Sequence, residues 1–327
     1  MALRAQQCAE ATSDYQKQLT TAGRDDAPVV MQEREEMKTV SLILLGLFGT
    51  AAALAEDINE MMDADSDGTV MISNVAGSVE VQGWSRNQVE VTGELGNRVE
   101  ELIFERDGDE IIIKVKVPRN SNGGISSDLV VNVPQASSLQ VNAVSADIEV
   151  SDVFGEQQLD SVSGDVITTA HESDIELGSV SGDIEVQGDN KPIRSRMSTV
   201  SGDVDADNLA GEVMAESVSG DVSVVNGSFQ RAAMETVNGD IVYHAQLMGD
   251  GRLDVETING SVDIDFGGDV SARFDIETFN GSIRNCFGPD SVKTSRYAPG
   301  RELKFTEGDG AGRVTINTLN GDLRLCK

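Results

Sequence analysis

Acidic residues recur at one position of a repeated tetrapeptide, and this position has the clearest potential for chemistry. The pattern is Val or Ile, then Ser or Asn, then Gly, then Asp or Ser. If the copies stack, the carboxylates lie about 5 Å apart and form a row that attracts cations. Ca²⁺ binds several carboxylate and carbonyl oxygens, so a cation-binding protein is one hypothesis. The acidic positions are Asp147 in a weaker first copy, then Asp165, Asp183, Asp203, Asp221, Asp240 and Asp322.

A structural role for these aspartates competes with metal binding, and we favour it. An Asp after Ser-Gly readily accepts the N–H groups of a turn. The spacing of the copies also differs from the nine-residue repeat of calcium-binding β-rolls. Residues 63–68 read Asp-Ala-Asp-Ser-Asp-Gly, like half of an EF-hand loop, but its twelfth position is Asn74 instead of Glu. We therefore predict no metal site and no cofactor.

Catalytic residues cannot be singled out. The two histidines, His171 and His244, have no companion pattern. A glycan-active β-helix enzyme needs a matched pair of carboxylates, and none stands out among 56 acidic residues. Arg296, Tyr297 and Arg301 could contact anionic sugars, or they could neutralise an acidic end of the fold. We predict a non-enzymatic protein, with the glycan-active enzyme as the alternative.

The spacing of the tetrapeptides predicts the fold. The copies recur every 18–21 residues, apart from a last step of 40. Strand residues with a Gly turn at this period are typical of a parallel β-solenoid with about 18–21 residues per rung. We interpret the repeat positions as tight turns where Gly tolerates a positive φ. The turn glycines are Gly164, Gly182, Gly202, Gly220, Gly239, Gly260, Gly281 and Gly321.

Stacked repeats place equivalent residues in columns. We expect the first position of the tetrapeptide to face the core, as in Val162, Val180, Val200, Val218, Val237 and Ile258. The preceding position is Ser or Thr in the eight copies after the weaker first one, and we expect it to serve the turn. The second position changes from Ser to Asn, and stacked Asn amides can bond along the column.

The two ends of the solenoid differ from its middle. Residues 56–141 alternate like strands but repeat only faintly, which predicts irregular rungs or a cap. Regular rungs follow over residues 142–284, then an excursion over 285–312 and a last rung over 313–327. A hidden degenerate rung is the alternative to the excursion. We expect a basic excursion to fold back over the end as a cap.

The N-terminal part predicts export. Met37-Lys38 precedes a short apolar run that ends in Ala53-Leu54-Ala55, as in a signal peptide over residues 37–55. Residues 1–36 are then an extension that is not translated; an uncleaved anchor with a cytoplasmic tail is the alternative. The net charge of −31 makes nucleic acid an unlikely partner. We expect a periplasmic or extracellular protein that does not span the membrane after cleavage.

The exported leader, the Val-Ser-Gly-Asp rungs and the late Thr-x-Asn-Gly turns resemble the bacterial putative-adhesin family of unknown function, which is related to head domains of autotransporter adhesins. The resemblance covers about residues 69–327. It implies a β-solenoid in the envelope or outside the cell. We separately expect the partner to be a surface glycan or an envelope protein. The resemblance implies no catalytic or binding residue.

The cysteines test the stacking. Cys286 and Cys326 each follow a turn glycine by five residues, so they occupy the same position in their rungs. If the 40-residue step holds one rung and an excursion, the two rungs are adjacent and their Cα atoms lie about 5 Å apart. An oxidising compartment would then join them in a disulfide.

Overall fold

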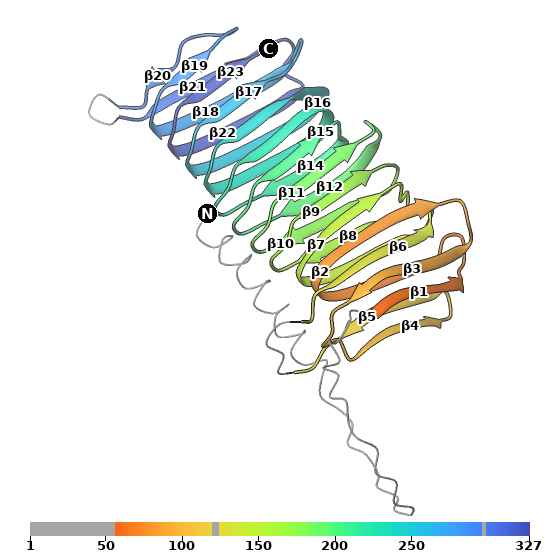
Figure 1. Cartoon of the computed structure of the whole chain (residues 1–327). Helices are drawn as coiled ribbons and strands as arrows, with labels where there is room; N and C mark the ends of the chain where they lie inside the picture. The colour runs from red at the N-terminus through yellow and green to blue at the C-terminus, as the bar shows by residue number, and fades with distance from the viewer. Residues whose placement is uncertain (1–55, 120–123, 296–298) are drawn as a thin grey trace, which may run out of the picture. The chain divides into compact units, whose positions relative to one another are not determined.

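The structure is a computed structural model that describes residues 56–119, 124–295 and 299–327 (Figure 1). The predicted extension, the predicted signal peptide, Arg296 and Tyr297 lie outside these residues. The described residues form 23 strands and no helix, so the all-β class is confirmed. Accordingly, this part of the chain holds no helix with the length and apolar character of a membrane span.

The first seven strands build one end of the sheet. They are β1 (Glu56–Asp63), β2 (Thr69–Trp84), β3 (Gln88–Leu95), β4 (Glu101–Asp107), β5 (Glu110–Lys116), β6 (Ser127–Pro134) and β7 (Ser138–Ser151). Strand β2 pairs in parallel with β5 and β6, and also with β7. Strands β3 and β1 continue antiparallel from β6, and β4 pairs antiparallel with β5. Antiparallel strands therefore lie along the first edge of the parallel sheet, where an open edge would invite aggregation.

The middle of the sheet is parallel throughout. Its strands are β8 (Gln157–Ser161), β9 (Val166–Ala170), β10 (Ile175–Ser179), β11 (Ile184–Gly188), β12 (Pro192–Ser198), β13 (Val204–Asp207), β14 (Ala210–Glu216), β15 (Val222–Asn238) and β16 (Ile241–Asn259). Each strand pairs with the equivalent strand of the next repeat. The chain of partners at one position runs Gln157, Ile175, Ser195, Val213, Ala232, Leu253. These partners follow the spacing of the sequence repeat.

In most strands the side chains alternate between core and surface. In β8–β11 the burial pattern begins buried, exposed, buried in every strand, as expected when one face of a strand is covered. Toward the C-terminal end, aromatic rings fill the core. Phe229, Tyr243, Phe266 and Phe274 follow one another with centroids 6.0–6.1 Å apart, and Phe274 stacks on Phe305 at 4.5 Å. These edge and stacked contacts continue the core from repeat to repeat.

The C-terminal repeats do not stack in the order of the chain. The remaining strands are β17 (Val262–Asp265), β18 (Ala272–Asn280), β19 (Ile283–Asn285), β20 (Val292–Lys293), β21 (Arg301–Thr306), β22 (Gly312–Asn320) and β23 (Leu323–Cys326). Strand β22 pairs in parallel with β16 on one side and with β18 on the other. Strand β23 likewise lies between β17 and β19. The last repeat of the sequence therefore occupies the second-last place in the stack.

This order corrects one expectation about the end of the sheet. The last repeat was expected to need a cap, but parallel strands flank it on both sides. The end strand is β18, and β21 runs antiparallel along its outer edge, followed by β20. The excursion therefore adds antiparallel strands and no hidden parallel repeat. Because β22 lies between β16 and β18, β18 becomes the end strand of the parallel sheet. The excursion covers the outer edge of β18.

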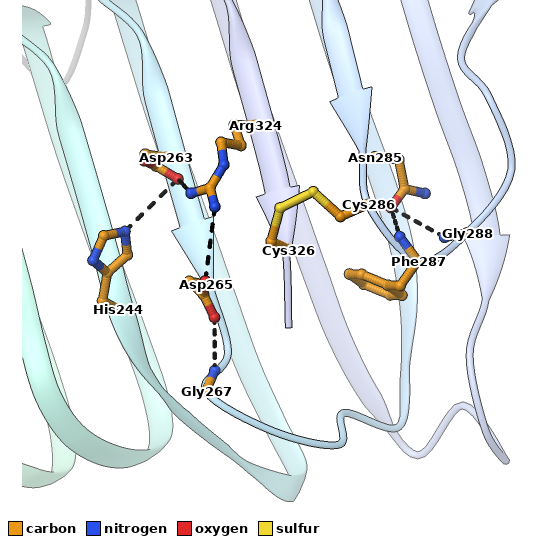
Figure 2. The surroundings of a disulfide bond; sticks show 10 residues. All are labelled: His244, Asp263, Asp265, Gly267, Asn285, Cys286, Phe287, Gly288, Arg324 and Cys326. Carbon is orange, nitrogen blue, oxygen red and sulfur yellow. Dashed lines mark hydrogen bonds and ion pairs between the residues drawn. A yellow bond between two sulfur atoms is a disulfide. The ribbon is translucent and has the colours of Figure 1, made fainter.

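A disulfide joins the last two repeats of the stack (Figure 2). Cys286 and Cys326 are bonded, their Cα atoms lie 4.9 Å apart, and the backbone N–H of Cys286 donates to the carbonyl of Leu325. This is the predicted pairing of adjacent repeats. A neighbouring ion pair also crosses repeats, since Nη1 of Arg324 on β23 contacts Asp263 on β17 at 2.5 Å. The bond closes a loop of 40 residues, for which the chain-entropy model gives about 3–4 kcal/mol of stabilisation.

Candidate functional site

The stacked tetrapeptides form a continuous surface, which we call the repeated corner. It runs along the line where one strand of each repeat ends and the next begins. Following the strand pairings, its nine copies start in this spatial order: Val144, Val162, Val180, Val200, Val218, Val237, Ile258, Leu319 and Phe279.

Glycine is required at the third position because the repeats approach each other closely there. A Cβ on Gly220 would overlap the carbonyl oxygen of Gly202, and the same overlap recurs at each of the eight turn glycines. None of these glycines has a φ in the left-handed region. The expected positive φ is therefore wrong, and steric contact with the neighbouring repeat is the reason for Gly.

The position before the tetrapeptide points into the core. Ser161, Ser179, Thr199, Ser217, Thr236, Thr257, Thr278 and Thr318 are all buried. Each hydroxyl donates to the carbonyl of the third tetrapeptide position in the neighbouring repeat, at 3.0–3.4 Å. A buried hydroxyl needs such a partner, and so does a buried carbonyl. This column therefore binds each repeat to the last.

The first position of the tetrapeptide points outward, which corrects the expectation that it faces the core. Val162, Val180, Val200, Val218, Val237 and Ile258 are only half-buried. Leu319 and Phe279 are exposed, at 46% and 51%. Because neighbours in a strand alternate, a core position for the Ser or Thr places the next residue outside. The sequence carried this signal: Leu159 and Ser161 share a parity, and so do Leu177 and Ser179.

The aspartates form a row along the corner, and each is used by the neighbouring repeat. The Oδ1 atom of Asp203 accepts the backbone N–H of Asp221 at 2.8 Å. The Oδ1 atoms of six further aspartates accept equivalent bonds of 2.7–3.0 Å from backbone N–H groups: Asp147, Asp165, Asp183, Asp221, Asp240 and Asp322. At Asp322, the bonds from the N–H and then the hydroxyl of Ser282 favour the charged form and lower the pKa of the carboxyl. The aspartates therefore hold turns.

Asparagine side chains continue the pattern at the second position. The amide of Asn259 donates to Asn238, that of Asn320 to Asn259, and that of Asn280 to Asn320, at 2.8–2.9 Å. The ladder follows the spatial order of the repeats and not the order of the chain. An unbroken series of amide bonds along exposed positions fixes the relative height of the last four repeats.

The other sequence candidates lie apart from one another. His171 contacts Asp189 at 3.4 Å, and His244 contacts Asp263 at 3.7 Å. The two histidines lie in repeats that are far apart in the stack. Asp65 in the EF-hand-like segment pairs with Arg106 at 2.7 Å, and the segment joins strands β1 and β2. Among residues 56–119, 124–295 and 299–327, no three His, Cys, Asp or Glu side chains converge as a metal site would require.

Arg301, the described member of the candidate sugar-binding trio, lines a pocket of about 230 Å³ at the end of the corner. Its Nη1 atom donates to the hydroxyl of Ser291 at 3.0 Å. Nearby, Lys304 contacts Asp275, Glu277 and Glu302, so the basic excursion does offset acidic charge here. The pocket lining comprises Glu277, Thr278, Phe279, Thr294, Gly300, Arg301, Asn317 and Thr318.

The carboxyl of Asp160, which lies near the corner, also has a shifted pKa. Burial raises the pKa of Asp160 to about 6, and the negative charge of Glu176 adds to the shift. The carboxylate lies over Gly178, where a Cβ would stand 2.6 Å from Oδ1 of Asp160. The carboxylate of Asp160 and the backbone of Gly178, which come from neighbouring repeats, therefore pack closely together.

Comparison with known proteins identifies the family of the chain. Residues 69–325 match the family described as Toastrack DUF4097. The chain belongs to this Toastrack family. The match covers nearly the whole region for which the sequence resembles the putative-adhesin family, so the expected family is confirmed. No curated protein matches the chain.

The solved structures to which the chain is similar share little sequence with it. A protein from Parabacteroides distasonis described as a putative lipid binding protein shares 14% identity, with a TM-score of 0.43, over 81% of this chain and 96% of its own. A putative adhesin from Bacteroides fragilis shares 9%, with a TM-score of 0.41, over 83% and 97%. One from Parabacteroides merdae shares 12%, with a TM-score of 0.30, over 83% and 97%. Likenesses at this level do not indicate what the Toastrack chain binds.

Gly220→Ala should destabilise the protein by about 2–4 kcal/mol in a urea melt, because the new Cβ forces two repeats apart. Gly268→Ala is the matched control, since a Cβ there meets nothing within 4 Å and its φ is not left-handed. Equal stability of the two variants would contradict the steric account of the turn.

Val218→Asp should cost less than about 1 kcal/mol, because its side chain reaches solvent. Ala215→Asp, three residues earlier at a fully buried position, should cost about 3 kcal/mol or more. Chemical denaturation of both variants measures the difference. A larger loss of stability for Val218→Asp than for Ala215→Asp would show that the first position faces the core.

Asp160→Asn should stabilise the protein at pH 7.5 by about 1–3 kcal/mol and have little effect at pH 4. The folded-state pKa of Asp160 exceeds the unfolded value, so the folded state binds more protons between about pH 4 and 6. Stability therefore falls as the pH rises through this window, and the neutral amide escapes the loss. Urea melts of parent and variant at both pH values test this; a pH-independent difference refutes it.

Proposed function

We propose that this Toastrack protein is an exported, non-enzymatic β-solenoid with about 18–21 residues per rung, which presents the repeated corner as a binding face at the cell surface or in the envelope. The observation that carries the proposal is the regularity of this face. Nine repeats place an outward apolar residue, a Ser or Asn, a Gly (Ala146 in the first copy) and an Asp or Ser in parallel columns. Repeat proteins use such extended surfaces to bind partners.

The polar groups of the corner support a scaffold in preference to a catalyst. The aspartates, the asparagines and the buried hydroxyls all bond to neighbouring repeats, and these bonds already occupy the groups that a reaction would need. The same bonds argue against cation binding by the Asp row, because its Oδ1 atoms accept backbone N–H groups. The proposal includes export by a cleaved signal peptide and a partner that is a surface glycan or an envelope protein.

A binding screen on the purified protein tests the proposal. Glycan arrays, isolated envelopes and intact cells are probed with and without Ca²⁺. We expect saturable binding to at least one envelope component, with no dependence on Ca²⁺ beyond the effect of ionic strength. Turnover of a glycan, or the absence of any surface binding together with recovery of the protein from the cytoplasm, would contradict it.

A further inference from the structure

The outward first positions of the nine tetrapeptides form one unbroken apolar line, which we call the apolar stripe. Its residues are the nine corner residues given above, from Val144 to Phe279. In five successive copies, the backbone N–H that follows the stripe residue donates to the carbonyl of the neighbouring stripe residue, from Ser163 to Val144 at 2.8 Å up to Asn238 to Val218 at 3.0 Å. The stripe thus has the regularity of the hydrogen-bonded repeats that carry it.

Core packing does not account for the stripe. The Ser and Thr column already fills the inward position beside it, and the stripe side chains lie on the other face of the strand. The side chains also grow toward the end of the stack, from Val237 to Ile258, Leu319 and Phe279, and the last two are the most exposed. Contiguous exposed apolar surface marks an interaction site.

Acidic residues lie on both sides of the stripe. The Asp row runs along one side, three positions after seven of the nine stripe residues; Ser261 and Ser282 stand at this position after Ile258 and Phe279. On the other side, two positions before it and on the same outward face, are Asp160, Glu216, Glu235, Glu256 and Glu277. The field of the row extends beyond its own residues. The pKa of Asp205 is raised, first by burial and then by the charges of Asp203, Asp183 and Asp221. A partner with basic residues beside its apolar face would match this surface.

The spacing of the stripe suits a helix. Neighbouring repeats lie about 4.8 Å apart, whereas one turn of an α-helix rises about 5.4 Å and two strand residues about 6.8 Å. A helix along the stack can therefore place one apolar side chain per turn against the stripe, with about seven turns over the nine repeats. Nine repeats span about 38 Å, which corresponds to about 25 helical residues.

We propose that the apolar stripe is the docking site for an amphipathic helix of a partner protein, with a narrow apolar face and basic residues on both sides of it. This inference rests on the proposed function, because it names the partner chemistry of the same face. One end of the docked helix contacts Phe279, which lines the same pocket as Arg301. Amphipathic helices bind partner proteins through their apolar face, with charged residues beside it that match the partner surface.

Two other occupants fit the surface less well. A second copy of the chain would bring two Asp rows together, and like charges across an interface oppose association. An anionic lipid surface would meet the same repulsion from both acidic sides.

The test uses a synthetic 25-residue helix with leucines on one face and lysines beside them. Its controls are a scrambled peptide of equal composition and a version with glutamates in place of the lysines. Binding to the purified protein is measured by fluorescence anisotropy at 50 and 300 mM salt. We expect saturable binding of the lysine helix that weakens with salt, and at least tenfold weaker binding of both controls.

Variants of the protein locate the site. Val218→Lys with Leu319→Lys should weaken binding of the lysine helix at least tenfold, whereas Ile167→Lys, at an exposed apolar residue away from the stripe, should not. Val218→Ser with Leu319→Ser serves as the milder pair if the lysine variant melts below the parent. Equal binding by stripe variants and parent, equal binding of the scrambled peptide, stripe-dependent self-association, or stripe-dependent binding to anionic vesicles alone would each overturn the proposal.

The envelope screen separates this inference from the proposed function. If the parent and the stripe variants bind an envelope component equally, the proposed function stands and the stripe proposal fails. If the parent binds no envelope component, the proposed function itself fails.

Discussion

The close approach of neighbouring repeats at the turn glycines is the constraint on which the rest of the structure depends. Each glycine stands against the carbonyl of the equivalent residue in the next repeat, so no side chain fits. Close contact brings that carbonyl within reach of the buried Ser or Thr hydroxyl, and it brings the Asp carboxylate within reach of the next N–H. The close approach at the turn therefore allows two columns of hydrogen bonds, in which each group is satisfied by the neighbouring repeat.

The same constraint decides which face each side chain takes. Because the hydroxyl column must point inward, the β-branched residue after it must point outward. The apolar stripe is thus a geometric consequence of the turn, but its apolar composition is not. Any residue that tolerates strand geometry could stand there. The chain nevertheless has Val at six of nine positions, and its largest stripe residues lie at the capped end. This composition is what the docking proposal explains.

Much of the architecture could be predicted from the sequence. The period of the tetrapeptide predicted parallel pairing, and the equivalent places of Cys286 and Cys326 predicted their bond. The direction of Val162 was predicted wrongly, because hydrophobicity was weighed above the period-2 parity that Leu159 and Ser161 share. The role of the glycines was also missed, since a turn glycine has two possible reasons and sequence does not separate positive φ from close approach.

The order of the last two repeats could not have been predicted. A repeat of constant period and chemistry pairs equally well with either neighbour, and Asn280 and Asn320 offer identical amides to the ladder. The exchange becomes visible only in the register, where β22 lies between β16 and β18. It has a structural consequence, because it leaves β18 as the end strand and lets β21, from the same excursion, cover it.

Disulfide trapping at the corner tests this account most directly. Asn259→Cys with Asn320→Cys places two exposed thiols on adjacent repeats, about 4.8 Å apart at Cα, whereas Asn259→Cys with Asn280→Cys places them two repeats apart, at about 9.6 Å. Mild oxidation followed by peptide mapping without reduction should show a bond for the first pair and none for the second. A bond for the second pair and none for the first would contradict the stacking order and the corner built on it.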